Sequence, residues 1–300
     1  MRQVWWNGKY LPESEAKVSI YDSCCMFADM PFEMQRTFNR KTFKLQEHLD
    51  RLWNSCKVLE IDIPYTKEEV YQAHEELLQW HIDNFPEEEE WRSLCNVTRG
   101  ILPMYQPLIG GGGTNVIIAC FPLRYVLRGH SHLYAKGVHA IVSQQRAIPQ
   151  HLLDVRCKTR SRLHYRMADL QVKKIDEEAL PILIDPEGNI AESSGSNIFI
   201  IKNGKVYSPF VRNTLDGISR RFDIYLCGSY FIEKDLTPHD CYEADEMFFT
   251  NTPYCILPIT KFNGQSVGDG KMGKKTIGLI GKWIVEVGCD FVQQAVRWDE

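Results

Sequence analysis

Short β-branched runs that end in tight turns recur along this 300-residue chain, and they constrain its fold more than any other feature. Residues 180–184 and 198–201 are two such runs. The turn sequences D-P-E-G at 185–188 and K-N-G at 202–204 follow them directly. This combination predicts short strands that are joined by turns.

Helical patterns lie between the predicted strands. Apolar side chains recur at helical spacing in residues 47–59, and the capping pattern T-x-x-E begins a helix predicted over residues 66–85. Further helices are predicted over residues 160–174, 217–225 and 274–298. Because the helices and strands do not alternate strictly, we expect an α+β fold.

The remaining strands are predicted from local apolar runs. A hairpin is expected within residues 4–20, around the turn-forming pair Asn7-Gly8. The other expected strands cover residues 43–45, 94–102, 114–121, 137–144 and 246–250. Four consecutive glycines at 110–113 are interpreted as a flexible loop, since no G-K-S/T follows to make a phosphate-binding loop.

A domain boundary is expected at residues 122–137, which show no hydrophobic period. A chain of this length can form two domains. We predict a small N-terminal α/β domain at residues 1–122, a linker at residues 123–136 and a large C-terminal domain at residues 137–300.

Composition and charge argue against several classes of protein. The formal net charge of -4 gives no electrostatic reason to expect nucleic acid or an anionic membrane as a partner. No apolar run is long enough to span a bilayer, and the N-terminus lacks the apolar core of a signal peptide. The ten cysteines show no C-x-x-C spacing, which favours reduced thiols in a cytoplasm. We therefore expect a cytoplasmic protein.

A metal site is not expected. His130, His132 and His139 lie near one another in the sequence, but no carboxylate or cysteine completes the set at a metal-like spacing.

Several segments carry chemistry in combination. They are E-H-L-D-R-L at 47–52, R-C-K at 156–158, A-E-S-S-G-S-N-I-F at 191–199, T-L-D-G-I-S-R at 214–220 and A-D-E-M-F-F-T-N-T at 244–252. With these segments the chain resembles the class IV aminotransferases, which are fold-type IV pyridoxal-phosphate enzymes. That family includes branched-chain and D-amino-acid aminotransferases, (R)-selective amine transaminases and aminodeoxychorismate lyase. The resemblance extends from the N-terminal hairpin to about residue 270.

The resemblance implies roles for three residues at the centre of the chemistry. Lys158 matches the lysine that forms the Schiff base with pyridoxal 5'-phosphate and then moves the substrate proton. In the family this lysine lies at the start of a helix, and the same is expected here. Glu192 matches the glutamate that binds the pyridine nitrogen and favours its protonated form. Arg51 matches the arginine that binds the cofactor phosphate, to which a guanidinium offers paired donors.

Other cofactor-binding residues follow from the same resemblance. Ser196 and Asn197 belong to the small, hydroxyl-rich segment that lets the backbone pass close to the cofactor. Ile218 and Ser219 match phosphate binders at a helix start, where unpaired amide groups attract an anion. Thr252 matches a hydroxyl that reaches the phosphate.

Substrate-binding candidates come from two branches of the family. Phe32 and Arg36 lie in F-E-M-Q-R, which matches F-E-x-x-R of the branched-chain enzymes. Glu33 of this motif argues against the lyase branch, which tends to carry threonines there. Arg99, in N-V-T-R-G, matches the arginine that binds the substrate carboxylate in D-amino-acid aminotransferases.

Neither branch is matched completely. The histidine that follows the arginine by two positions in D-amino-acid enzymes is Ile101 here, and the branched-chain tyrosine two positions before it is Val97. Arg160 and Arg162 are additions after the lysine. They either form a binding site for a second substrate carboxylate, for which we name Arg162 as the candidate, or are simply exposed.

The sequence therefore predicts a two-domain fold-type IV aminotransferase, similar to D-amino-acid aminotransferase, with pyridoxal 5'-phosphate in the cleft between its domains. The resemblance implies a homodimer that transfers an amino group between an amino acid or amine and a 2-oxo acid. Two alternatives stay open. One is a β-eliminating enzyme similar to aminodeoxychorismate lyase. The other is a non-catalytic binding module, against which the intact Lys158 and Glu192 argue.

Overall fold

Two compact units make up the chain, and the computed structural model describes all of residues 1–300. The first unit contains Met1–Leu123 together with Cys157–Ser161, and the second contains Arg124–Arg156 and Arg162–Glu300. Residues 123–136 are predicted from the sequence to form a linker; of these, Leu123 belongs to the first unit, and the others belong to the second unit, where they include helices α5 (Arg124–Leu127) and α6 (His132–Lys136).

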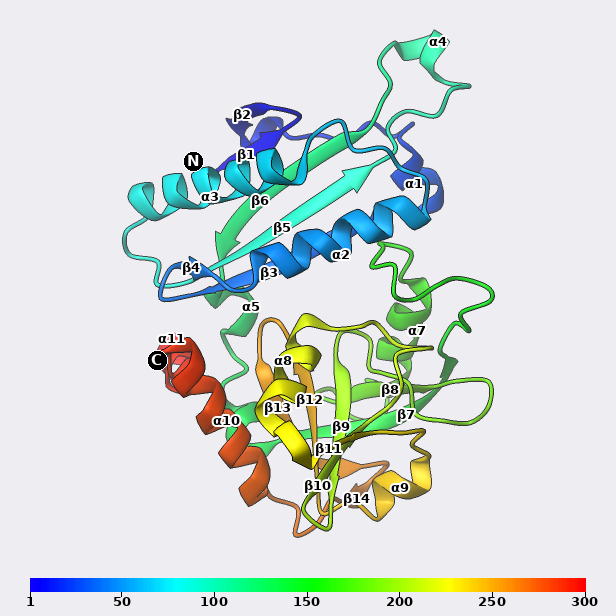
Figure 1. The fold of residues 1–300 in the computed structure, drawn as a ribbon, viewed down its shortest axis with the longest axis vertical. Coiled ribbons are helices and arrows are strands. Elements are labelled where there is room, and N and C mark those ends of the chain that lie inside the picture. The colour runs from blue at the N-terminus through cyan, green and yellow to red at the C-terminus, as the bar shows by residue number, and fades with distance from the viewer. The chain divides into compact units, whose positions relative to one another are not determined.

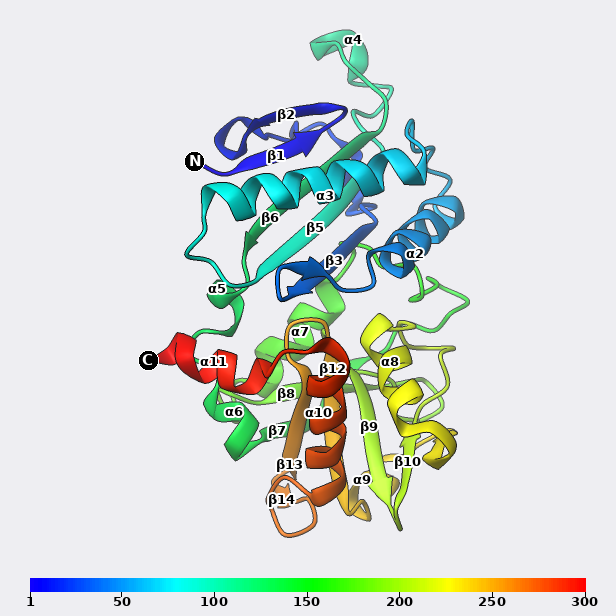
Figure 2. The same cartoon turned by 60° about the vertical axis from the view of Figure 1, so that its left-hand side comes forward.

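The first unit has a six-stranded antiparallel sheet in the order β2-β1-β6-β5-β3-β4. Helices α2 (Leu45–Val58) and α3 (Lys67–Asn84) lie along one face of this sheet (Figures 1 and 2). The strands are β1 (Gln3–Trp6), β2 (Lys9–Pro12), β3 (Phe32–Phe38), β4 (Lys41–Thr42), β5 (Trp91–Thr98) and β6 (Asn115–Pro122). The short helices are η1 (Glu13–Glu15), α1 (Ser23–Phe27) and α4 (Gln106–Ile109).

Alternation along β5 explains why the helices cover this face. Trp91, Cys95 and Val97 are fully buried and pack with the apolar side chains of α2 and α3. The intervening residues of the strand belong to the opposite face, as strand geometry requires. The predicted capping box is present, because the Thr66 hydroxyl accepts from the Glu69 amide and the Glu69 carboxylate accepts from the Thr66 amide.

The predicted strand at residues 43–45 is wrong. The strand β4 ends at Thr42, and α2 begins at Leu45. Lys44 between them has φ +54°, in the left-handed region that interrupts an extended strand. The apolar pair Phe43 and Leu45 therefore reflects a strand end followed by a helix start.

The second unit has an eight-stranded mixed sheet in the order β11-β10-β9-β12-β13-β7-β8, with β14 paired to β13. The pairs β10–β11, β13–β7 and β7–β8 are parallel, and the others are antiparallel. The strands are β7 (Val138–Arg146), β8 (Leu180–Ile184), β9 (Asn197–Lys202), β10 (Lys205–Ser208), β11 (Phe231–Glu233), β12 (Glu246–Asn251), β13 (Cys255–Phe262) and β14 (Gln265–Ser266).

Helices of the second unit pack on this sheet. The helix α7 packs on β7 and β8, while α8 and α10 pack on each other and on β12. The helices are α7 (Leu163–Val172), α8 (Ile218–Cys227), η2 (Gly228–Tyr230), α9 (Pro238–Tyr242), α10 (Lys274–Val287) and α11 (Phe291–Asp299). None of the helices is both long and apolar enough to cross a membrane.

The prediction of one helix over residues 274–298 is wrong, because two helices occupy this segment. Gly288, at φ +64°, ends α10 in the left-handed conformation, and its amide donates to the carbonyl of Ile284. The Asp290 side chain then accepts from the amide of Gln293 and begins α11. Apolar periodicity continues across the break and hides it.

Gly100, two residues after β5, offers a test of the close approach between the segment that follows β5 and the segment that precedes β6. Its φ is +89°, and a Cβ there would lie 1.9 Å from the carbonyl oxygen of Gly113. We expect Gly100→Ala to lower the free energy of unfolding by about 1–2 kcal/mol for the left-handed backbone and about 1–3 kcal/mol more for the clash. Gly110→Ala is the matched control, because Gly110 has φ +68° with nothing within 4 Å of a Cβ. Equal losses in the two variants, measured by chemical denaturation, would contradict the steric explanation.

Candidate functional site

A buried carboxylate joins β3 to α2 in the first unit. Glu33 is 0% exposed, and its two oxygens accept from Arg51 Nε at 2.5 Å and Arg51 Nη2 at 2.8 Å. His48 Nδ1 lies 2.7 Å from Glu33 Oε2. His48 and Arg51 are three residues apart on α2, so both side chains face the strand.

The charges of this cluster follow from burial and pairing. Burial by itself would raise the pKa of Glu33, but the adjacent Arg51 and His48 hold it well below its usual range. Burial lowers the pKa of His48 despite the carboxylate beside it, so the imidazole is neutral at pH 7. Since an ionised carboxylate can only accept, Nδ1 of His48 carries the hydrogen.

Lys158 lies in an extended segment next to this cluster. Its carbonyl accepts from the amide of Phe32 at 2.9 Å, and its amide donates to Ser55 Oγ at 3.2 Å. Ser55 in turn donates to the carbonyl of Arg51, one helical turn earlier. The lysine Nζ lies 5.0 Å from the centre of the Phe32 ring. The main chains of Lys158 and Arg51 are thus linked through one serine.

The expectation that Lys158 begins a helix is wrong. The helix α7 begins at Leu163, and Thr159 instead pairs with Pro31 at the start of β3. The main-chain pairing holds residues 157–161 in the first unit, although the chain on both sides belongs to the second.

The predicted substrate residues of the first unit are not gathered in one place. Phe32 is covered by the guanidinium of Arg160, which lies 3.7 Å from the ring centre and donates to Asn96 Oδ1 at 3.0 Å. Arg36 is four positions further along β3, about 13 Å away. It is 1% exposed, donates to the carbonyl of Thr37 and lies 4.1 Å from the Phe38 ring centre.

Arg99 lies at the C-terminal end of α2. It donates to the carbonyls of Leu59 at 2.7 Å and Glu60 at 2.9 Å, and it pairs with Asp29 at 3.1 Å. Cations at this end of a helix stabilise its free carbonyl groups. Both Nη1 and Nη2 of Arg99 therefore already donate to main-chain carbonyls of the fold.

Glu192 is the centre of a second cluster, in the second unit. It is 5% exposed. Its Oε1 accepts from the Tyr165 hydroxyl at 2.5 Å, and its Oε2 accepts from the Leu215 amide at 3.0 Å and from Asn197 Nδ2 at 3.4 Å. Asn197 also donates to the carbonyl of Leu215 at 2.8 Å. The carboxylate is therefore fixed in orientation by three donors.

The start of α8 approaches this cluster closely. A Cβ on Gly217, its N-cap residue, would lie 2.1 Å from Asn197 Oδ1. No side chain caps the helix, and Ile218 and Ser219 in its first turn are buried. Ser196 accepts from Asn251 Nδ2 at 2.8 Å, and Thr252 follows in the turn between β12 and β13.

Arg162 and Tyr165 belong to the Glu192 cluster as well. Arg162 donates to the carbonyl of Ser194, and its guanidinium lies 4.6 Å from the centre of the Tyr165 ring. Sequence reasoning missed Tyr165, which lies outside every segment that carries the family resemblance. It also missed Ser55. His48 carried a detectable signal, since it shares a helix face with Leu49, Arg51 and Leu52.

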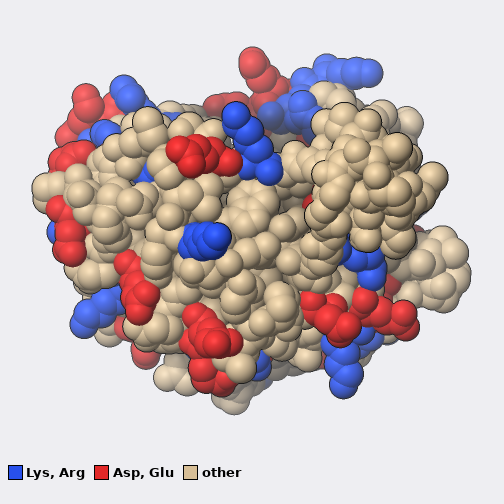
Figure 3. All heavy atoms as spheres, turned by 90° about the horizontal axis from the view of Figure 1, so that it is seen from above, with Lys and Arg blue, Asp and Glu red and all other residues tan.

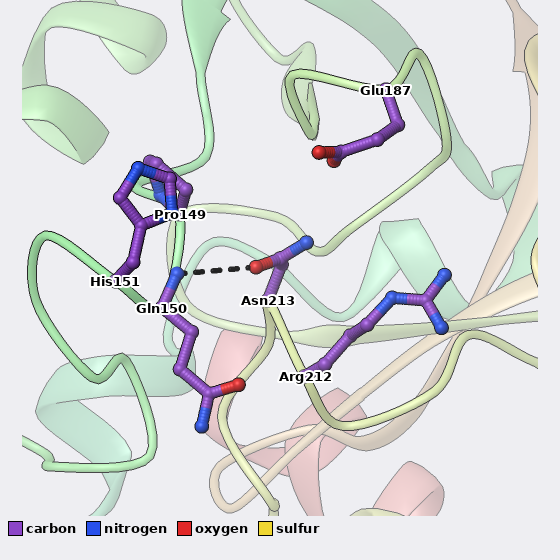
Figure 4. A pocket seen from close by; sticks show the side chains of 6 residues that line it. All are labelled: Pro149, Gln150, His151, Glu187, Arg212 and Asn213. Atoms are coloured by element: carbon purple, nitrogen blue, oxygen red, sulfur yellow. Dashed lines mark hydrogen bonds between the residues drawn. The ribbon is translucent and has the colours of Figure 1, made fainter.

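A cavity of about 400 Å³ lies elsewhere in the second unit (Figure 4). The main-chain amide of Gln150 donates there to Asn213 Oδ1, at 3.3 Å. Its lining residues are Pro149, Gln150, His151, Glu187, Arg212 and Asn213. None of the predicted site residues is among them.

Taken unit by unit, the residues include groups that suit parts of pyridoxal 5'-phosphate. In the second unit, a buried carboxylate with a fixed orientation suits the ring nitrogen, and an uncapped helix start with a buried serine suits the phosphate. In the first unit, the lysine next to Phe32 carries an amine of the kind with which the cofactor aldehyde reacts.

Comparison with known proteins identifies the family. The sequence profile of the amino-transferase class IV family matches residues 31–262. A Methanocaldococcus jannaschii protein with the provisional name of a branched-chain-amino-acid aminotransferase is 33% identical over 280 residues, covering 91% of this chain and 92% of that one. A D-alanine aminotransferase of Listeria monocytogenes is 30% identical over 290 residues, covering 95% and 96%.

Solved structures agree in fold. The branched-chain aminotransferase of Thermoproteus uzoniensis, solved with norvaline, has a TM-score of 0.82 at 26% identity, covering 99% of this chain and 98% of that one. The branched-chain amino acid aminotransferase of Escherichia coli has a TM-score of 0.79 at 24% identity, covering 94% and 93%. Another branched-chain amino acid aminotransferase, solved with pyridoxamine 5'-phosphate, has a TM-score of 0.85 at 24% identity, covering 95% and 94%. The likeness to these last two concerns the fold alone.

Class IV aminotransferases use pyridoxal 5'-phosphate to move an amino group between an amino acid or amine and a 2-oxo acid. The match covers most of the chain, and none of the similar proteins above is named as a lyase. This chain belongs to the class IV aminotransferase family and is a pyridoxal-phosphate-dependent aminotransferase.

Proposed function

We propose that Lys158 is the residue that binds the cofactor covalently and carries the substrate proton. The observation that supports this role best is the link through Ser55 between the main-chain amide of Lys158 and the main-chain carbonyl of Arg51, the residue that matches the phosphate-binding arginine of the family motif. When bound, the protonated cofactor ring supplies an electron sink for a substrate Cα. The Lys158 amine, once released from the cofactor, removes the Cα proton and holds it for return.

Cofactor binding is assigned to the remaining family positions. Arg51, Ile218, Ser219 and Thr252 bind the phosphate. Glu192 binds the ring nitrogen, and its orientation by Leu215 and Asn197 supports this role. Ser196 and Asn197 hold the segment behind Glu192.

For the substrate, we favour a branched-chain L-amino acid as donor and a 2-oxo acid as acceptor. The F-E-M-Q-R motif and the replacement of the D-amino-acid enzymes' histidine by Ile101 support this choice. Phe32 lies beside Lys158 and would contact the substrate. Arg36 is assigned to the scaffold, because it is 1% exposed and donates to the main-chain carbonyl of Thr37. We assign Arg99 and Arg162 to the scaffold, because carbonyl groups of the main chain already engage them.

A donor panel tests the substrate. Purified holoenzyme is mixed with single L-amino acids, D-amino acids and (R)-amines, and conversion of the bound cofactor to its amino form is followed by absorbance. L-Leucine, L-isoleucine and L-valine are expected to react fastest. Faster conversion by D-alanine or by an (R)-amine would contradict this assignment.

Lys158→Ala is expected to abolish transamination and covalent attachment of the cofactor. Borohydride reduction of the wild-type enzyme followed by mass spectrometry should place the pyridoxyl group on the peptide that contains Lys158. Lys173→Ala, a lysine just after α7, is the control and should retain both. A pyridoxyl group on another lysine of the wild-type enzyme would disprove the assignment.

Glu33→Gln is expected to lower the free energy of unfolding at pH 7 by about 3–5 kcal/mol, because it leaves Arg51 buried without its counter-charge. The affinity for the cofactor should fall as well, since Arg51 loses its fixed orientation. The folded-state pKa of Glu33 lies below the ordinary value of 4.5, so its contribution is complete above that pH and is lost as the pH falls further. Denaturant unfolding should therefore show a smaller loss on acidification below pH 4.5 in the variant than in the wild type. Equal losses would contradict the role of Glu33.

A homodimer is proposed from an exposed apolar surface of the first unit. Contacts between Tyr21 and Tyr105, whose ring centres are 4.8 Å apart, bring the segment around α1 beside the loop that carries α4. Figure 3, seen from the end where α4 lies, shows a broad area without charged side chains on that side. The exposed apolar residues are Ile20 (72%), Phe27 (67%), Met104 (71%) and Leu108 (73%).

Light scattering after size-exclusion chromatography tests the dimer. Wild type is expected at twice the chain mass, and Phe27→Glu with Leu108→Glu should shift the population to monomer. Val285→Glu is the control, because Val285 is 80% exposed on α10 of the second unit. A wild-type monomer would overturn the proposal. We also propose a cytoplasmic location, which the ten unbridged cysteines support; fractionation of the source cells checks it.

A further inference from the structure

Tyr165 and Glu192 form a short hydrogen bond on the second unit. Tyr165 lies in the first turn of α7, and its hydroxyl donates to Glu192 Oε1 at 2.5 Å. Burial raises the pKa of Tyr165 and the carboxylate beside it raises it further, so the phenol stays protonated and remains a donor. The Tyr165 hydroxyl therefore remains a donor to Glu192 at neutral pH.

The tyrosine is itself held in place. The guanidinium of Arg162 lies 4.6 Å from the centre of its ring, and the His164 ring centre lies 3.9 Å away. Arg162 also donates to the carbonyl of Ser194, two residues after Glu192. One arginine thus restrains both the tyrosine and the segment that carries the glutamate.

The two carboxylate oxygens of Glu192 accept hydrogen bonds from different groups. Main-chain and amide donors from Leu215 and Asn197 reach Oε2, whereas Tyr165 reaches Oε1. Each donor favours the ionised carboxylate over the neutral acid. Tyr165 is the one of these that lies outside the segments 191–199 and 214–220.

We propose that Tyr165 is a positioning residue that keeps Glu192 ionised and thereby keeps the proton on the nitrogen of the cofactor ring. The inference rests on the proposed role of Glu192. A proton shared between a carboxylate and a ring nitrogen can lie on either partner. A hydroxyl that donates to the carboxylate stabilises the state in which the nitrogen carries it.

Nitrogen NMR of the holoenzyme tests this directly. The enzyme is loaded with pyridoxal 5'-phosphate labelled with ¹⁵N in the ring, and the ring resonance is recorded. In Tyr165→Phe we expect it to move toward the position of an unprotonated pyridine, with kcat lowered roughly tenfold to a hundredfold. Tyr207→Phe, on β10 of the same unit, is the matched control and should leave the resonance unchanged.

Glu192→Gln distinguishes a failure of the role proposed for Glu192 from a failure of the role proposed for Tyr165. If this variant leaves the ring resonance where it was, the assignment of Glu192 to the ring nitrogen fails. If Glu192→Gln moves the resonance and Tyr165→Phe does not, the role of Tyr165 alone is overturned.

A second measurement tests the proposal if the Tyr165→Phe protein does not fold. Tyr165 is replaced by 3-fluorotyrosine, which keeps the shape of the ring and makes its hydroxyl a stronger donor. The resonance is then expected to stay at the protonated position or to move further toward it. Movement toward the position of an unprotonated pyridine overturns the proposal.

Discussion

The carboxylate of Glu33 is the constraint on which the first unit depends. An isolated charge in a protein interior costs far more free energy than a single hydrogen bond returns, so its position is tolerable only beside close, well-oriented partners. Arg51 and His48 supply these partners from one face of α2. The helix can therefore lie against β3 in one register, and through Ser55 that register also sets where the main chain of Lys158 runs.

A second buried carboxylate organises the other unit in a different way. Glu33 is paired with a guanidinium, which neutralises its charge, whereas the donors around Glu192 include a main-chain amide, a side-chain amide and a phenol. Such donors hold a carboxylate in one orientation and favour its ionised form. The first arrangement suits a scaffold, and the second suits a group that attracts a cationic ring. The close approach of Gly217 to Asn197 brings the start of α8 into the same cluster.

Features with local signals could be predicted from the sequence. The hairpin at Asn7-Gly8, the capping box of α3 and the family segments around Lys158 and Glu192 each depend on a few consecutive residues. Features that depend on distant partners could not. The extended path of Lys158 comes from pairing with β3, and the contacts of Arg99 come from the end of α2. Periodicity also misled where a left-handed residue, Lys44 or Gly288, divides two elements.

The chain passes between its two units at residues 123–124, 156–157 and 161–162. A protein built by joining two finished domains end to end would pass between them once. Here Lys158 lies in the first unit because the short segment Cys157–Ser161 leaves the second unit and the chain then returns to it. A cut after Leu123 would separate the first sheet from Lys158, whose carbonyl accepts from the amide of Phe32. Neither half of the chain, expressed alone, would therefore keep all of its native contacts. Such interleaving couples the unfolding of one unit to that of the other through the short segment that contains Lys158.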